Sequence, residues 1–155
     1  MTTANHVVTG ALIAVTVHNP VLAISVCYIS HFVLDAIPHF SPSMPRDIFE
    51  RNKNKTFRRV LTLNIISAAM LTSLIYVKLQ DSVSLGLFLA CIIAANLPDL
   101  VWIPRFIQEH ITHKERPRGP ISELHVRIQH DSVKLGAMNE IIYFAAALLI
   151  LAIVA

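Results

Sequence analysis

The stretch VLTLNIISAAMLTSLIYV, residues 60–77, contains 18 consecutive residues without a charged side chain and decides the fold class. It lies between Arg59 and Lys78, and its length falls in the range of about 17 to 25 residues that a membrane-spanning helix needs. Two further apolar runs of similar length occupy residues 82–98 and 135–155. The three runs together predict a chain whose helices cross a bilayer.

The composition supports the same fold class. Hydrophobic residues make up 54% of the chain and charged residues only 15%, against roughly 25% charged residues in a soluble domain. Shorter apolar segments at 7–17 and 21–37 raise the expected number of membrane-spanning helices to four or five, depending on whether the first segment crosses fully. The chain of 155 residues has the length of one domain. We therefore expect an all-α polytopic membrane protein, with residues 1–155 forming a single membrane-embedded helical domain.

The positive charges predict the topology. Twelve of the 13 Lys and Arg residues lie in two polar stretches, 41–59 and 105–134, which an alternating path places on one side of the membrane. The positive-inside rule makes these stretches cytoplasmic loops and the N-terminus cytoplasmic. No Lys or Arg precedes Arg46, so residues 1–25 do not resemble a cleaved signal peptide. The expected location is the cytoplasmic (inner) membrane of a prokaryote.

The same basic stretches bear on possible partners. They lack interleaved aromatic residues, and the chain is too apolar for a soluble nucleic-acid binder, so no nucleic-acid partner is expected. Contacts with anionic lipid headgroups explain the positive charge better. Membrane lipid is therefore the expected partner.

Regularly spaced histidine and aspartate residues interrupt the second apolar segment. In SHFVLDAIPHF, residues 30–40, His31, Asp35 and His39 follow one another at intervals of four residues. This spacing places all three on one stripe of a helix. Burying such side chains in a membrane is costly, so they are candidates for a functional site.

Other polar residues converge on the same membrane face along the predicted path. His6 begins the first helix, and Asp99 ends the fourth. His125 lies in the amphipathic stretch ISELHVRIQHD, and Glu140 lies about one turn into the last helix. Residues distant in sequence thus reach one depth, which argues more strongly for a site than any single motif does.

The chemistry of this group predicts a metal centre. Imidazole nitrogens and carboxylate oxygens are ligands of zinc, and zinc with an open position makes water a nucleophile near neutral pH. The expected metal is zinc or another divalent transition metal, and Glu140 is the candidate general base. The candidate ligands are His31, Asp35, Asp99 and His6, followed by His39 and His125.

Simpler interpretations remain open for several of these residues. His39 follows Pro38 and could be an interfacial residue, and Glu140 could serve only to anchor the last helix. The whole cluster could also join helices without turnover, as a metal-binding or structural element. A transporter is disfavoured, because the polar residues gather at one face and do not line a path through the midplane.

Three motifs together resemble a known family. NHVVTGALIA at 5–14, SHFVLDAIPH at 30–39 and NLPDL at 96–100 are similar to the predicted membrane-bound metal-dependent hydrolases, a group distantly similar to zinc-dependent phospholipase C. LHVRIQ at 124–129 resembles a late His element of that family. The resemblance implies that His6, His31, Asp35, Asp99 and His125 fill the family's ligand positions.

These observations lead to one main functional hypothesis. We expect a metal-dependent hydrolase at the cytoplasmic membrane face that acts on a phosphoester such as a lipid headgroup. The alternative is a non-enzymatic metal-binding or structural membrane protein whose His and Asp cluster joins helices.

Overall fold

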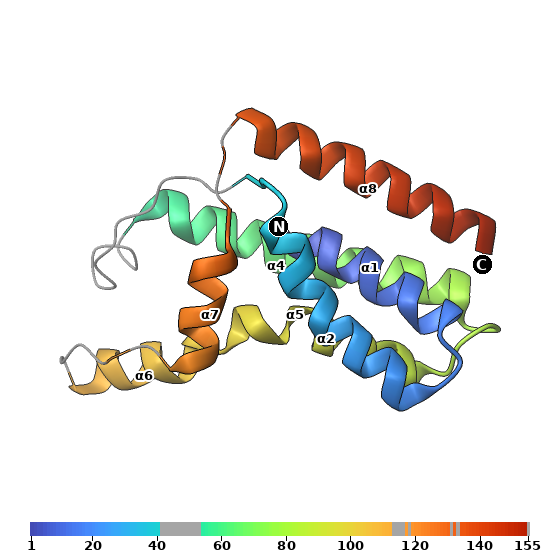
Figure 1. The fold of residues 1–155 in the computed structure, drawn as a ribbon, viewed down its shortest axis with the longest axis horizontal. Helices are drawn as coiled ribbons and strands as arrows, with labels where there is room; N and C mark the ends of the chain where they lie inside the picture. The colour runs from blue at the N-terminus through green and yellow to red at the C-terminus, as the bar shows by residue number, and fades with distance from the viewer. Residues whose placement is uncertain (41–53, 113–116, 118, 131, 133, 155) are drawn as a thin grey trace.

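The computed structural model describes residues 1–40, 54–112, 117, 119–130, 132 and 134–154. These residues form helices and contain no strand, as the all-α prediction requires (Figure 1). The predicted polar stretch 41–59 lies largely outside the described residues. The helices are α1 (Thr3–Thr16), α2 (Pro20–Ala36), α4 (Lys55–Leu79), α5 (Leu85–Leu100), α6 (Trp102–Thr112), α7 (Pro120–Ile128) and α8 (Lys134–Val154).

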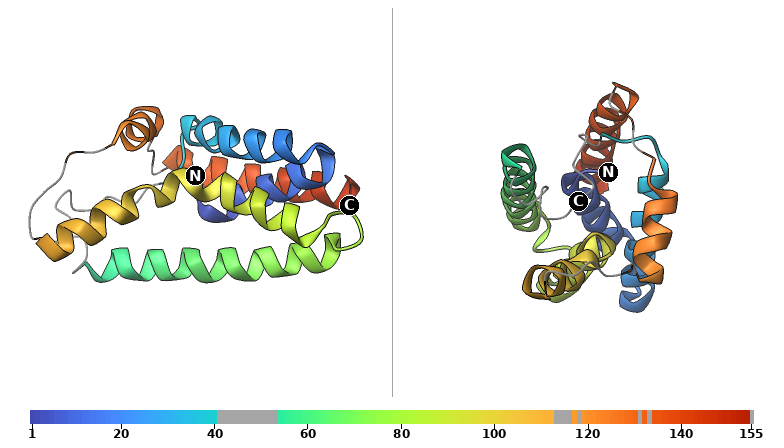
Figure 2. Two further views of the ribbon diagram at one scale, coloured as in Figure 1. Left: turned by 90° about the horizontal axis from the view of Figure 1, so that it is seen from below. Right: turned by 90° about the vertical axis from the view of Figure 1, so that its left-hand side faces the viewer.

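Helix α1 occupies the centre of the bundle and contacts α2, α4, α5 and α8 (Figure 2). Many of its buried positions are small or β-branched, among them Val7, Val8 and Ala11, which are almost completely buried. Gly10 permits a close approach of α1 to α5, since a Cβ there would lie 3.2 Å from the carbonyl oxygen of Cys91 on α5. Small residues allow helix backbones to approach in this way in membrane proteins.

The side chain of the residue just before the helix fixes where several helices begin. Asn19 accepts a hydrogen bond from the backbone N–H of Leu22, and Pro20 follows as the first residue of α2. Asn54 caps α4 in the same manner, and Ser84 caps α5. These caps satisfy backbone donors that a helix N-terminus otherwise leaves unpaired. Helix α2 ends at Ala36, and the next residue, Ile37, is extended. Ile37 precedes Pro38, and the residue before a proline is driven out of the helical conformation.

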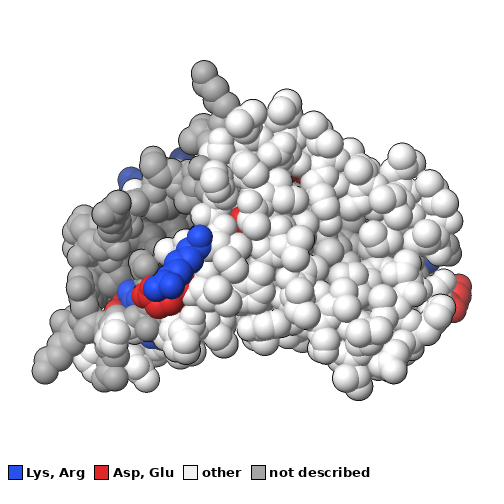
Figure 3. Space-filling view, viewed as in Figure 1, with Lys and Arg blue, Asp and Glu red and all other residues white. Residues whose placement is uncertain are grey.

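The outer surface carries the signature of a membrane protein. Large apolar side chains are widely exposed, among them Leu63, Met70 and Leu74 on α4. Figure 3 shows a broad surface without charge over the bundle, with charged side chains at its two ends. Exposed apolar area on this scale requires a covering phase, and a bilayer provides one.

The structure corrects the expected number of membrane-spanning helices. Among the described residues, α4 and the segment Leu135–Val154 of α8 are long and apolar enough to cross a bilayer. A third span results if Leu85–Leu100 and Ile103–Glu109, which meet at 48°, cross as one broken segment. Helices α1 and α2 contain 14 and 17 residues. Their lengths of about 21 and 26 Å are shorter than the roughly 30 Å hydrocarbon layer.

The second polar stretch, 105–134, contains more regular structure than a loop. It includes most of α6 and the whole of α7, both strongly amphipathic helices. Such helices typically lie in the plane of the membrane interface. Helix α7 contacts α2 and α5, and this contact brings His125 to the bundle.

Candidate metal centre

Four predicted ligands meet where α2, α5 and α7 contact one another. His31 and Asp35 lie one turn apart on α2, Asp99 lies near the end of α5, and His125 lies on α7. One ligand atom from each of the four lies within 4.8 Å of all the others. In Figure 1 this meeting point lies where α7 stands beside the C-terminal half of α2.

Four of the five distances between the ligand atoms lie close to those around a tetrahedral ion. The Nε2 atom of His31 lies 3.3 Å from Nε2 of His125, 3.3 Å from Oδ2 of Asp35 and 3.6 Å from Oδ1 of Asp99. His125 Nε2 lies 3.5 Å from the same Asp99 oxygen and 2.7 Å from Oδ2 of Asp35. Zinc–ligand distances of about 2.0–2.1 Å place neighbouring atoms of a tetrahedron about 3.3–3.4 Å apart. Small adjustments would therefore suffice to hold one ion.

A backbone contact orients the His31 ring toward this group. Nδ1 of His31 lies 2.8 Å from the carbonyl oxygen of Ala95 on α5. Because a carbonyl can only accept, Nδ1 must carry the proton and donate it, which leaves the lone pair of Nε2 directed at the cluster. Metal-ligating histidines are usually fixed in this way by a second hydrogen bond.

Asp35 is the most central and most buried carboxylate of the group. Its Oδ2 faces His31 and His125, whereas its Oδ1 forms an ion pair with the N-terminal ammonium group of Met1 and lies 3.3 Å from Nε2 of His6. Its side chain is only 1% exposed. A buried carboxylate needs positive charge or several hydrogen bonds to compensate for lost hydration. The N-terminal ammonium of Met1 is one source of that charge, and a metal ion would be another.

His6 lies beside the four-ligand group and is not one of its members. The ring is fully buried and stacks on the His31 ring, with centroids 4.2 Å apart and planes inclined by 19°. Neither of its ring nitrogens makes a hydrogen bond in the described part of the chain. Its Nε2 still lies 3.3 Å from the Asp35 carboxylate, so Nδ1 is the buried ring nitrogen without a described partner.

His125 is the ligand supplied from outside the apolar helices. Its hydrogen bond to Asp35 raises the pKa of the imidazole above its usual value, although partial burial opposes the shift. Two backbone hydrogen bonds just beyond α7 hold the C-terminal end of this helix against the residues at the end of α2. The N–H of His130 donates to the carbonyl of Asp35 at 3.1 Å, and the N–H of His39 donates to the carbonyl of His130 at 3.0 Å.

His39 contributes to this connection and does not join the ligand group. Its Nδ1 lies 3.0 Å from the carbonyl oxygen of Ile37, and its Nε2 lies 3.5 Å from the amide nitrogen of Gln129. Because the helix ends before Pro38, His39 no longer continues the stripe of His31 and Asp35. Of the three regularly spaced residues, only His31 and Asp35 therefore share one stripe of a helix.

The Glu140 carboxylate lies against the start of α1. It accepts hydrogen bonds from the backbone N–H of Thr2 at 2.8 Å, from the Thr2 hydroxyl at 2.6 Å and from the Asn5 amide at 2.5 Å. A second link joins the same two helices, since the hydroxyls of Thr9 and Tyr143 lie 2.7 Å apart. These contacts make Glu140 a clasp between α8 and the N-terminus of α1, where a negative charge is favoured.

Removal of this clasp should reduce stability and leave the metal centre intact. In Glu140→Ala the donors of Thr2 and Asn5 lose their acceptor, which is expected to lower the free energy of unfolding by about 1–3 kcal/mol. Thermal unfolding in detergent measures this effect, and metal content measures the second expectation. Asp81→Ala, an exposed acid between α4 and α5, is the matched control. Unchanged stability in Glu140→Ala would contradict the clasp.

Sequence reasoning missed several groups that complete the site. The carbonyl of Ala95 carries no signal in a sequence, and the contact of Gly136 with the residues after α2 is equally hidden. A Cβ at Gly136 would lie 2.3 Å from the carbonyl carbon of His39. A glycine near the start of an apolar helix was the only available hint of so close an approach.

Two imidazoles and two carboxylates form a donor set that suits zinc and related divalent metals. The set combines a pair at i, i+4 on one helix with single ligands from two others, so tertiary packing assembles it. Comparison of the chain with protein-family models, with curated proteins and with solved structures gives no match.

Proposed function

We propose that His31, Asp35 and His125 hold a divalent transition metal beside Asp99, with zinc as the best fit. The observation that carries this proposal is the convergence of four ligand atoms within 4.8 Å from three helices. The oriented Nε2 of His31 supports it further. Magnesium and calcium prefer oxygen ligands and fit two imidazoles less well.

We propose further that the centre hydrolyses a phosphoester at the cytoplasmic face of a prokaryotic inner membrane. A divalent metal bound there would polarise a phosphoryl oxygen and lower the pKa of a water molecule. The stretch 105–134, which carries α7, is rich in Lys and Arg, and these are suited to anionic lipid headgroups. The resemblance to predicted membrane-bound hydrolases agrees with this assignment.

Within the site, Asp99 is the side chain best placed to act on a water molecule. Its side chain is 37% exposed, whereas those of His31 and Asp35 are almost fully buried. Its Oδ1 lies 3.5–3.6 Å from the two imidazole nitrogens, longer than the separations among His31, Asp35 and His125. Catalytic zinc sites use three protein ligands and keep the fourth position open. We therefore assign His31, Asp35 and His125 as the firm ligands and Asp99 as the proton acceptor.

A structural metal site is the second candidate, and the number of ligands favours it. Four protein ligands close a tetrahedral zinc site and leave no position for water. A site of this kind would join α2, α5 and α7 without turnover. The role of Asp99 separates the two functions, because a closed site needs it as a ligand and an open one does not.

The variant Asp99→Asn makes this distinction. If Asp99 acts on water, the variant should keep near-stoichiometric zinc and lose hydrolysis of a phosphodiester lipid substrate by about 100-fold or more. Metal content and turnover are measured on the same purified samples, with Asp81→Asn as the matched control. If Asp99→Asn loses zinc and the wild type shows no turnover, the structural site is favoured.

A further inference from the structure

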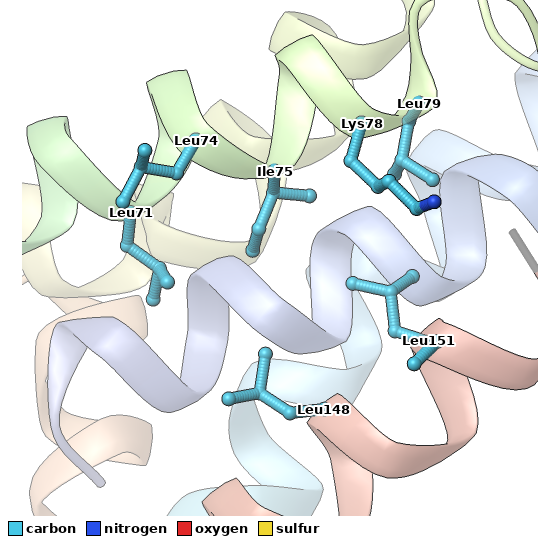
Figure 4. Close-up of a pocket in the computed structure, with 8 residues that line it drawn as sticks. Leu71, Leu74, Ile75, Lys78, Leu79, Leu148 and Leu151 are labelled. Atoms are coloured by element: carbon cyan, nitrogen blue, oxygen red, sulfur yellow. The ribbon is translucent and has the colours of Figure 1, made fainter.

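A groove between α4 and α8 lies apart from the metal centre and has no role in the proposed reaction. Its volume is about 260 Å³, and seven of its eight lining residues are apolar. Figure 4 shows side chains of α4 and α8 facing one another across it. The lining residues are Leu71, Leu74, Ile75, Lys78 and Leu79 from α4, and Leu148, Leu151 and Ala152 from α8.

The groove is elongated and has a buried floor with an exposed rim. Ile75, Leu79 and Leu151 are almost completely buried, whereas Leu74 is 67% exposed. From Leu71 to Lys78 it follows about two turns of α4, a length of roughly 10 Å along the helix axis. Its long direction therefore parallels the helices that cross the membrane, as the acyl chains of a bilayer do.

One cation closes the groove at its outer end. Lys78 lies in the last turn of α4, just before the turn that leads to α5, and is exposed. It forms no ion pair with any residue that the structure describes. Lys78 is also the only Lys or Arg outside the two basic stretches of the sequence. Figure 2 shows this end of α4 at the side of the bundle away from α6 and α7.

We propose that this groove binds one acyl chain of an anionic phospholipid, with the Lys78 ammonium paired to the phosphate of its headgroup. An apolar groove parallel to the membrane normal fits an amphiphile with a negatively charged headgroup, because the cation at its interfacial end pairs with no residue in the described ranges. The aliphatic stem of Lys78 lines the groove while its charged end reaches the interface. The site lies at the membrane face opposite to the metal centre and does not depend on the proposed hydrolase.

Native mass spectrometry of the detergent-purified chain tests this proposal. Dioleoyl phosphatidylglycerol is the probe, and dioleoyl phosphatidylcholine, which has no net charge, is compared with it. We expect one phosphatidylglycerol bound per chain, about fivefold weaker binding in Lys78→Ala, and at least tenfold weaker binding in Leu148→Trp, which fills the groove. Lys55→Ala, at the other end of α4, is the matched control and should bind as the wild type does.

Two results would overturn the proposal. One is phosphatidylglycerol binding in Lys78→Ala and Leu148→Trp that stays within twofold of Lys55→Ala. The other is a dimer of the chain without bound lipid that Leu148→Trp converts to monomer, because a second copy would then occupy the groove. Lys78 is exposed, so its replacement leaves the bundle folded and keeps the comparison valid.

Discussion

Replacement of Asp35 by asparagine is expected to raise the dissociation constant for zinc by on the order of 100-fold or more and to abolish phosphoester hydrolysis. Asp35 contacts His31, His125 and His6, so one carboxylate joins all the imidazoles of the site. Asparagine preserves the shape of the side chain and removes its charge. Structural zinc sites bind with about 10–16 kcal/mol shared among four ligands, and each tenfold change corresponds to about 1.4 kcal/mol.

Competition with a chromophoric chelator measures this dissociation constant on the purified protein in detergent. Asp81→Asn is the control, because Asp81 is an exposed acid at the other end of the bundle. Circular dichroism establishes whether each variant keeps its helices. Zinc affinity in Asp35→Asn equal to that of the control would show that Asp35 is not a ligand.

Replacement of Gly136 by alanine is expected to destabilise the protein by about 3 kcal/mol or more and to weaken metal binding together with stability. A Cβ on Gly136 would lie 2.3 Å from the carbonyl carbon of His39 and 2.4 Å from the backbone nitrogen of Phe40. These contacts are with backbone atoms, which cannot rotate away as a side chain can. Overpacking of this kind commonly costs about 1–3 kcal/mol and occasionally more.

The link from Gly136 to the metal centre runs through the residues after α2. The carbonyl of Pro38 accepts a hydrogen bond from the Asn139 amide at 2.8 Å, so α8 holds this segment. The segment in turn pairs with the connection beyond α7, where the N–H of Ser132 donates to the carbonyl of His39 at 2.9 Å. A displaced His39 should therefore displace α7 and with it His125.

The matched control for this variant has the opposite expected sign. A Cβ at Gly86 in α5 meets nothing within 4 Å, so Gly86→Ala should stabilise the helix by up to about 1 kcal/mol. Thermal unfolding in detergent and metal content compare the two variants. Equal stability of Gly136→Ala and the wild type would contradict the proposed coupling between α8 and the metal centre.

The sequence predicts much of the His and Asp cluster from the expected path of the chain. This path ends the second and fourth apolar segments at one face, so Asp35 and Asp99 are expected to lie together, as they do in the structure. The i, i+4 spacing of His31 and Asp35 then fixed their common face. The amphipathic pattern around His125 predicts a helix, and α7 brings this imidazole to the cluster.

The remaining features depend on tertiary contacts that no local pattern encodes. The place of Glu140 beside Thr2 and Asn5 requires knowing that α8 lies against α1. The departure of His39 from the ligand stripe follows from the helix end before Pro38 and from pairing with residues about 90 positions later. Apolar composition also overstates the number of spans, since α1 and α2 are apolar helices shorter than the bilayer.

The decisive measurement for the proposed metal centre is the metal content of the detergent-purified wild type, determined by inductively coupled plasma mass spectrometry beside His31→Ala and His18→Ala. We expect close to one zinc or other divalent transition metal per chain in the wild type and in His18→Ala, where the exposed histidine lies between α1 and α2. We expect His31→Ala to lose that metal. A folded wild type with no bound metal after incubation with zinc, or a His31→Ala variant that keeps it, would contradict the assignment of this cluster as a metal centre.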